Sequence, residues 1–450
     1  LHDDRIGARP HIVSAARRIG NADLAPDAKR AVFSARGELF TVPAEKGDIR
    51  NISGTPGVHE RRPAWSPDGK WVAYFSDASG EYELHVRRGD GEGEERQVTK
   101  GSDTYYVGLQ WSPDSKSILT YDAARILRLV DLESGKSHKI DQDPTGRQFD
   151  VSWSPDSRWV AYAIGEPNGF RSVFLYDTDA EKATRATAGF TDDHSVAFDP
   201  DGKYLYFASS RHFNPRIGGY DLKPLWTEQD GLYLIVLAAD GEHPFAPESD
   251  EVSFEEDEDE DEDAEKDAKK DDDEDEGEKD DDGDKDDADK DDEDEVEATV
   301  IDLDGIGHRI VALDVEAGNY FSLGAASGKL FYISAPAEAD DASLHLFDME
   351  ERESKDVLGS CNGYTLSHDG KSLLYTANRT WGIVSAAADQ KPAKKPLRID
   401  EMRAKSVPAE EWEQIFIDAW RLEGDYFYDP GMHGVDWESL RDNYGKLVPY

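Results

Sequence analysis

Trp65-Ser-Pro-Asp-Gly-Lys70 is the clearest copy of a motif that recurs along the chain. The position before its basic residue repeats every 41 to 46 residues, apart from one interval of 126 residues. A period of ~40–45 residues indicates stacked supersecondary units, so the sequence predicts a repeat architecture. The other copies are Leu24-Ala-Pro-Asp-Ala-Lys29, Trp111-Ser-Pro-Asp-Ser-Lys116, Trp153-Ser-Pro-Asp-Ser-Arg158 and Phe198-Asp-Pro-Asp-Gly-Lys203, with degenerate copies at Ala326-Ser-Gly-Lys329 and Leu366-Ser-His-Asp-Gly-Lys371.

The motif has the chemistry of a tight turn between two strands. Pro fixes φ at the first central position, the Asp side chain caps a following amide, and Gly or Ser tolerates the last position. Apolar runs such as Val151–Trp153 and Trp159–Ala163 flank the turn, a third run such as Ser172–Tyr176 follows, and a weaker fourth completes the unit. Four short strands per repeat make one propeller blade, so seven copies predict an all-β, seven-bladed β-propeller.

The long interval contains a strongly acidic run. Residues 255–297 hold 31 acidic and 6 basic residues, which is about half of the net charge of −47. Such a run cannot offset its ordering entropy by burying apolar surface, so we expect an acidic disordered insertion at residues 250–298, within blade five. The third and fourth strands of that blade are predicted at Leu232–Leu237 and near Arg309–Leu313.

A helical pattern replaces the blade pattern after residue 400. Pro408 marks a helix start, and a second helix is predicted after Asp436. We therefore expect an N-terminal linker at 1–20, the propeller at 21–400, and at 401–450 the start of a helical region that is cut just inside a second domain. The apolar faces of the two helices should need a partner surface. Their residues are Trp412, Ile415, Phe416, Ala419 and Trp420 in the first helix and Trp437, Leu440, Tyr444 and Leu447 in the second.

Motifs for catalysis or metal binding give little support for an active site. Cys361 lies in a Gly-x-Cys-x-Gly stretch, but a strand rather than a helix is predicted to follow it, so we interpret it as an inter-blade loop residue. The stretch 278–283 resembles the start of a calcium loop but lacks its twelfth-position Glu. No serine elbow, Gly-rich phosphate loop or His-Glu-x-x-His motif occurs in the sequence. We expect no catalytic residue, cofactor or metal in this chain.

Two other groups of residues invite a functional reading. Trp65, Trp111 and Trp153 share one repeat position, which favours packing between blades over ligand binding. The non-repeating stretch 209–216 interrupts blade five, and loops on a rigid scaffold often carry binding residues. Its charged members Arg211, His212 and Arg216 are therefore candidates for lining a substrate channel.

The charge and hydropathy of the whole chain exclude two classes of partner. The strongly negative net charge and the lack of a basic face argue against nucleic acid. No apolar stretch approaches the ~18–20 residues that a membrane span requires.

The repeated blades resemble TolB-like and peptidase-associated propellers, and the C-terminal tail is more specific. The stretches Glu411-Trp412, Ala419-Trp-Arg421, Asp425–Asp429 and Gly431–Trp437 resemble the entry into the catalytic region of tricorn-type serine peptidases. Ile301–Ile306 and the following Arg309-Ile-Val resemble part of the propeller of that family.

This resemblance implies a larger enzyme. A six-bladed propeller would precede this one, PDZ-like and α/β domains would follow, and the whole would form a hexamer that trims peptides in the cytoplasm, or in the periplasm after removal of an export signal. The catalytic histidine and serine are then expected beyond Tyr450, and His433 is read as structural. This portion would act as a gate for extended peptides.

Two alternatives remain open at the level of sequence. One is a non-enzymatic TolB-like propeller that binds a protein partner. The other is the propeller of a prolyl-oligopeptidase-like enzyme, in which an α/β-hydrolase domain would follow directly.

Overall fold

The computed structural model describes residues 8–147, 149–213, 215–217, 224–246, 297–336 and 341–448. The described residues up to 243 and from 297 onward belong to one compact unit. The calcium-loop-like stretch at 278–283 lies outside the described residues. The predicted disordered insertion at 250–298 also lies outside them, except for its last two residues.

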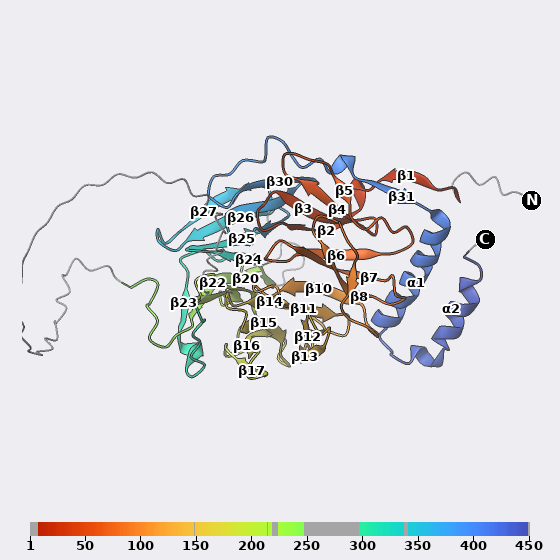
Figure 1. Cartoon of the computed structure of the whole chain (residues 1–450). Coiled ribbons are helices and arrows are strands. Elements are labelled where there is room, and N and C mark those ends of the chain that lie inside the picture. Colours follow the sequence, from red (N-terminus) through yellow and green to blue (C-terminus); the bar gives the residue numbers. More distant parts are fainter. Residues whose placement is uncertain are drawn as a thin grey trace, which may run out of the picture. The chain divides into compact units, whose positions relative to one another are not determined.

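Seven antiparallel sheets arranged in chain order confirm the seven-bladed propeller (Figure 1). Blades one to three are β2 (Ile19–Leu24), β3 (Arg30–Ala35), β4 (Glu38–Pro43) and β5 (Arg50–Asn51); β6 (Glu60–Trp65), β7 (Trp71–Ser76), β8 (Glu83–Arg88) and β9 (Arg96–Gln97); β10 (Tyr106–Trp111), β11 (Ser117–Asp122), β12 (Ile126–Asp131) and β13 (Ser137–Gln142). Blade four is β14 (Asp150–Trp153), β15 (Trp159–Gly165), β16 (Arg171–Asp177) and β17 (Lys182–Arg185).

Blade five confirms the two strands predicted on either side of the acidic run. Its sheet is β18 (Asp193–Phe198), β19 (Tyr204–Ser210), β22 (Asp230–Val236) and β23 (Ile310–Ala312), and the hairpin of β20 (Pro215–Ile217) and β21 (Pro224–Trp226) lies between β19 and β22 in the chain. Blades six and seven are β24 (Tyr320–Ala326), β25 (Lys329–Ser334), β26 (Ser343–Asp348) and β27 (Glu353–Leu358); β28 (Gly363–Leu366), β29 (Ser372–Ala377) and β30 (Thr380–Ser385).

The repeated turn has the hydrogen bonds that its sequence predicts. The Asp68 carboxylate accepts a bond from the Lys70 amide at 3.0 Å, and Gly69 has a φ of +71°, a conformation that glycine adopts without steric cost. A contact between turns was not predicted from the sequence. The Asp68 amide donates to the Ser115 hydroxyl at 3.1 Å, and the Asp114 amide donates to Ser157 at 3.0 Å, so neighbouring blades are joined along this face of the ring.

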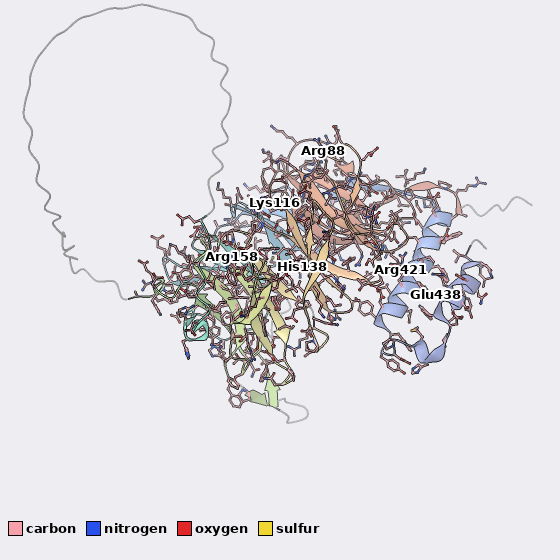
Figure 2. All side chains as sticks on the ribbon, turned by 60° about the horizontal axis from the view of Figure 1, so that its bottom comes forward. Arg88, Lys116, His138, Arg158, Arg421 and Glu438 are labelled. Carbon is pink, nitrogen blue, oxygen red and sulfur yellow. The ribbon has the colours of Figure 1, made fainter. Side chains whose placement is uncertain are left out.

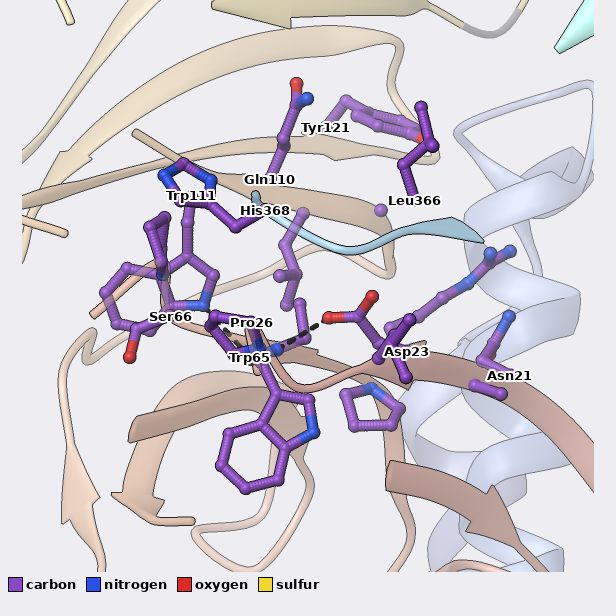
Figure 3. Close-up of a pocket in the computed structure, with 18 residues that line it drawn as sticks. Asn21, Asp23, Pro26, Trp65, Ser66, Gln110, Trp111, Tyr121, Leu366 and His368 are labelled. Atoms are coloured by element: carbon purple, nitrogen blue, oxygen red, sulfur yellow. Dashed lines mark hydrogen bonds between the residues drawn. The ribbon is translucent and has the colours of Figure 1, made fainter. Parts of the chain in front are cut away.

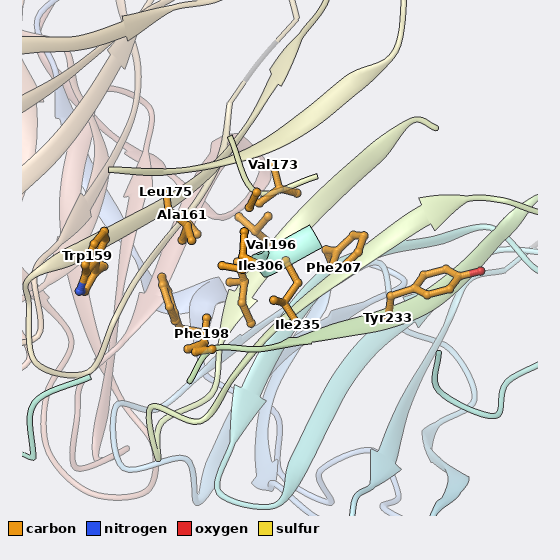
Figure 4. Packing of buried hydrophobic residues seen from close by; sticks show 13 residues of the cluster. Trp159, Ala161, Val173, Leu175, Val196, Phe198, Phe207, Tyr233, Ile235 and Ile306 are labelled. Carbon is orange, nitrogen blue, oxygen red and sulfur yellow. The ribbon is translucent and has the colours of Figure 1, made fainter. Parts of the chain in front are cut away.

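Apolar side chains fill the spaces between adjacent blades. Figure 4 shows such a cluster, in which Trp159 and Leu175 of blade four pack with Phe198 and Phe207 of blade five. The repeated tryptophans are buried in equivalent clusters, as predicted, and the Trp111 indole also donates to the Ala64 carbonyl at 3.1 Å. Burial of these faces is the main apolar contribution to the stability of the ring.

The two ends of the propeller meet in a small separate sheet. β1 (His11–Ser14) pairs antiparallel with β31 (Arg403–Ser406), and Figure 1 shows them side by side. β1 therefore lies in the stretch that we expected to be an N-terminal linker.

The two predicted helices are confirmed as α1 (Pro408–Tyr426) and α2 (Trp437–Gly445), with Asp436 capping α2 through the Ser439 amide. Trp420 of α1 and Trp437 of α2 stack with ring centroids 6.1 Å apart, so the helices cover part of each other's apolar faces. Short 3-10 turns are η2 (Ala16–Arg18), η3 (Ile306–His308), η4 (Ile399–Glu401) and η5 (Met432–Gly434). Within the described ranges, no helix is long and apolar enough to cross a membrane.

Candidate functional site in the propeller channel

The innermost strands of four blades line a cavity of about 340 Å³, which we call the channel cavity. Its walls come from β2, β6 and β10, with Leu366 and His368 contributed by blade seven. Figure 3 shows Asn21, Gln110 and Tyr121 around this space, with Asp23 bonded to the Trp65 amide at 2.7 Å. The cavity therefore lies where a propeller has its central channel.

A second cavity of about 780 Å³, the helix-side cavity, lies between α1 and blades one and two. Strand ends and loops of the blades form one wall, and residues of α1 such as Ile415 and Asp418 form the other. Asn21 and Arg62 line both cavities, so these two residues lie between the two spaces. Both volumes lie within the ~300–1,000 Å³ typical of ligand sites.

The polar face of α1 holds the helix over this part of the propeller. Arg421, labelled on α1 in Figure 2, contacts the Asp77 carboxylate at 3.2 Å, and both side chains are almost fully buried, 6% and 5% exposed. The Asp418 carboxylate accepts a hydrogen bond from the Tyr82 hydroxyl at 2.9 Å and lies 3.5 Å from Nδ1 of His59. Burial alone would raise the pKa of Asp418, but its bonds with His59 and Tyr82 outweigh burial and lower it.

Two buried ionisable residues stand in succession at the start of β6. Glu60 is 2% exposed, and burial raises its pKa to about 8, although the Thr55 hydroxyl donates a hydrogen bond to it. The Arg61 guanidinium lies between the rings of Tyr82 and Tyr105, 4.3 and 3.5 Å from their centroids, and bonds the Tyr106 carbonyl. The two rings and the carbonyl hold the Arg61 guanidinium in place, while Nε of Arg61 and Oε2 of Glu60 are buried without a hydrogen-bond partner among the described residues.

The residues predicted from sequence to line a substrate channel lie elsewhere. Arg211 follows β19 and packs over the Tyr233 ring at 4.4 Å, while its Nε donates to Ser209 at 2.9 Å. His212 is exposed, and its amide donates to the Gln229 carbonyl at 3.1 Å. Arg216 lies in β20 opposite Leu225, and its side chain is outside the described part of the structure. None of the three residues lines the two cavities described above.

The remaining sequence candidates have structural positions. Cys361 is fully buried, burial raises the pKa of its thiol to about 11, and β28 follows it as predicted, so it is no activated nucleophile. Across the described residues, no group of three or more His, Cys, Asp or Glu side chains is placed to hold a metal ion.

Our sequence reasoning missed Arg62 and Gln110, which line the channel cavity. A signal was present for Arg62, because Glu60-Arg-Arg-Pro63 puts three consecutive charged residues and a proline at the start of an innermost strand, a combination that no other blade has there. No comparable signal marks Gln110, since a single polar residue is common on a strand.

Comparison with known proteins identifies both parts of the chain. Residues 19–387 match a family model described as the tricorn protease second beta propeller domain, and residues 408–450 match one described as the tricorn protease C1 domain. Over 99% of this chain, tricorn protease homolog 1 of Streptomyces coelicolor is 28% identical. A putative tricorn-like protease C-terminal subunit of Sulfurisphaera tokodaii is 24% identical over 92% of the chain.

The crystal structure of the tricorn protease has the same fold. It superimposes with a TM-score of 0.79 over the whole of this chain, at 18% sequence identity, and the match spans 40% of that protein. Against the two curated relatives, the chain spans 41% and 44% of their length. Because the propeller model alone covers well over half of the chain, the chain belongs to the tricorn protease family.

Proposed function

We propose that this chain is the propeller and domain-junction portion of a tricorn-like serine peptidase that degrades peptides. Its channel would admit extended peptides, or release products, while excluding folded proteins. The observation that supports this proposal is the position of the channel cavity next to the helix-side cavity, beneath the first helix of the C1 segment, with Asn21 and Arg62 lining both.

The chemistry that we propose for the complete enzyme is acyl transfer. A serine would attack the scissile carbonyl, a histidine would transfer the protons, and backbone amides would hold the oxyanion. We assign none of these roles to a residue of this chain. PDZ-like and α/β domains of the same protein would supply them, and a cytoplasmic hexamer is the assembly that the family resemblance favours.

We also propose that Arg211, His212 and Arg216 contact peptides on the blade-five side of the channel mouth. Supporting this, Arg211 and His212 follow β19, in the connection that corresponds to the β7–β8 turn of blade two. That turn contacts α1 through Asp77, so the two connections lie on the same face of the propeller.

Blocking the channel in the complete enzyme tests the proposed function. Gln110→Trp places a large ring in the channel cavity, whereas Gln142→Trp puts the same ring on the exposed outer strand β13 as a matched control. We expect Gln110→Trp to slow the hydrolysis of fluorogenic ten-residue peptides at least tenfold, and Gln142→Trp to leave the rate unchanged. Equal rates in all three proteins, with equal melting temperatures, would contradict a peptide route through this channel.

A further inference from the structure

Arg62 is a cation in the channel without a protein partner. It is half-buried and lines both cavities. Its guanidinium makes no hydrogen bond or ion pair with any residue in the part of the chain that the structure describes. An arginine side chain that is partly removed from water, in a protein with a net charge of −47, would ordinarily be paired with a carboxylate.

The carboxylates around the same cavities are already engaged. Each of them accepts a hydrogen bond from, or pairs with, a group other than Arg62. These pairs are Asp23 with the Trp65 amide, Glu38 with Asn51, Glu60 with Thr55, Glu411 with Arg36, and Asp418 with Tyr82. Oε2 of Glu60 has no hydrogen-bond partner among the described residues, but burial raises the pKa of Glu60 to about 8 and so favours its neutral form, which is no counter-charge for Arg62.

The backbone at Arg62 is held in an unusual conformation. Its φ is +55°, and the pairing of β6 with β7 shifts register between Arg61 and Ala64, which defines a β-bulge. A non-glycine residue in this region costs roughly 1–2 kcal/mol, and Pro63 restricts the next position as well. Bulges redirect side chains and are common beside binding sites, so the local structure favours a placed guanidinium.

A second unpartnered group lies in the channel cavity. The Oε1 atom of Gln110 is buried and accepts no hydrogen bond from the described residues, and Figure 3 shows Gln110 beside Tyr121 in the wall of the cavity. A buried acceptor left without a donor costs about 1–3 kcal/mol, which an incoming N–H group would recover. The cavity thus offers a cation and an amide acceptor, and a peptide carries the complementary carboxylate and N–H.

We propose that the channel cavity binds peptides through a carboxylate that pairs with the Arg62 guanidinium, while Gln110 Oε1 accepts a peptide N–H. This inference rests on the proposed function and specifies its substrate class. The carboxylate comes either from the C-terminus of the peptide or from an acidic side chain. Arginine suits both, because its planar guanidinium can donate two parallel hydrogen bonds to a carboxylate.

The test measures binding to the full chain by fluorescence anisotropy. The probes are a pentaalanine peptide with a free C-terminus, the same peptide as its C-terminal amide, and Ala-Ala-Glu-Ala-Ala amide, each with an uncharged dye at the N-terminus. The variants are Arg62→Gln, Arg62→Lys and, as a matched control, Arg18→Gln. Arg18 lines the helix-side cavity from an exposed position, and its guanidinium also has no partner among the described residues.

We expect the free acid to bind wild-type protein at least tenfold more tightly than the amide, and Arg62→Gln to remove this preference. Arg62→Lys should keep only part of it, because it retains the charge without the planar group, and Arg18→Gln should keep all of it. The Arg62→Lys result also supports the proposal independently if Arg62→Gln fails to fold. If Ala-Ala-Glu-Ala-Ala amide binds as tightly as the free acid, the site accepts any carboxylate. If Ala-Ala-Glu-Ala-Ala amide binds as weakly as the pentaalanine amide, the site accepts only the carboxylate of a C-terminus. Either result supports the proposal.

Equal affinity of the free acid and the amide for the wild-type protein would overturn the proposed carboxylate site. A preference for the free acid that survives in Arg62→Gln would also overturn it. If the amide peptide still binds in those cases, the proposed peptide channel stands without its carboxylate site. If no peptide binds at all, both the channel function and the carboxylate site are contradicted.

Discussion

The buried ion pair between Arg421 and Asp77 should control how firmly α1 is held on the propeller. Removing one partner of a buried pair costs about 3–5 kcal/mol, because the other charge stays buried without compensation. Asp77 also accepts hydrogen bonds from the His59 amide at 2.7 Å and from Gln414 at 3.1 Å, which places the cost of Arg421→Met near the lower limit. A loss of about 3 kcal/mol corresponds to roughly a 150-fold increase in the opening of α1.

Amide hydrogen exchange resolved along the chain measures this opening directly. In Arg421→Met we expect exchange in α1 to accelerate roughly 150-fold, while the inner strands of the blades keep their wild-type rates. The reason is that the pair lies at the contact between helix and propeller and not inside a blade. The matched control is Arg441→Met on α2, where the arginine packs over the Trp420 ring at 4.9 Å and pairs with the exposed Asp442. Contacts of this kind contribute about 1 kcal/mol or less, so its effect should stay below tenfold.

The pairing itself is tested by a double-mutant cycle with Asp77→Asn. If the two charges interact, the double variant should open less than the product of the two single effects predicts, by about 0.5–3 kcal/mol. Exchange in α1 within threefold of wild type in Arg421→Met would refute the reasoning. So would an equal acceleration in Arg441→Met.

Three further predictions concern other parts of the chain. Burial raises the pKa of Glu60 to about 8 from 4.5. The contribution of Glu60 to the free energy of unfolding is therefore complete below pH ~4.5 and is lost as the pH rises to 8. In urea unfolding, the stability of the wild type relative to Glu60→Gln should fall by about 1.4 kcal/mol per pH unit across that window. Deleting residues 255–297 and joining the ends with a short linker should lower the melting temperature by less than ~5 °C, because loop closure depends weakly on length, and a larger drop would show that the run packs on the propeller. The chain alone should not be labelled by a fluorophosphonate. Ser195 is the serine to check, because its Oγ lies 3.2 Å from Nδ1 of His194, but it is only 9% exposed. Stoichiometric labelling of Ser195 would contradict our assignment of catalysis to other domains.

The blades could be predicted from sequence because their deciding interactions are local. In Ser66-Pro-Asp-Gly-Lys70 the hydrogen bonds that form the turn join residues only two to five positions apart, so the same letters produce the same turn in each blade. The position of Trp111 follows from the same regularity, since four of the seven repeats have a large ring here (Trp65, Trp111, Trp153 and Phe198), and Trp111 packs against the preceding blade. Periodicity likewise located both helices, where one face of each is apolar.

The docking of α1 could not be predicted in the same way. The apolar faces led us to expect an unpartnered surface, and Trp412, Ile415, Tyr444 and Leu447 are indeed exposed. Trp420, however, packs on Trp437 of α2, and the charged face of α1 contacts the propeller. In the sequence, Asp418 and Arg421 look like residues of a solvated face. Their partners Tyr82 and Asp77 lie more than 300 residues away, so no local pattern connects them.

The two ends of the channel differ in how much their residue types vary between blades, and this difference locates the candidate site. At one end the Ser-Pro-Asp turns of blades two to four are nearly identical in sequence, and bonds such as that from Asp68 to Ser115 fix one blade to the next. At the other end, the pairing of five innermost strands shifts register near their first residues; these strands are β2, β6, β10, β18 and β24. A bulge breaks the strict alternation of side chains between faces, so residues there can be redirected without disturbing the packing between blades. Arg62 occupies such a bulge, at the end that α1 covers. The bulge recurs, since Ser195 of β18 and Ser322 of β24 have the same positive φ as Arg62, but the residue that it carries differs between blades. Binding chemistry specific to this protein is therefore to be sought in the residues at these bulges, and not in the repeated turns that define the fold.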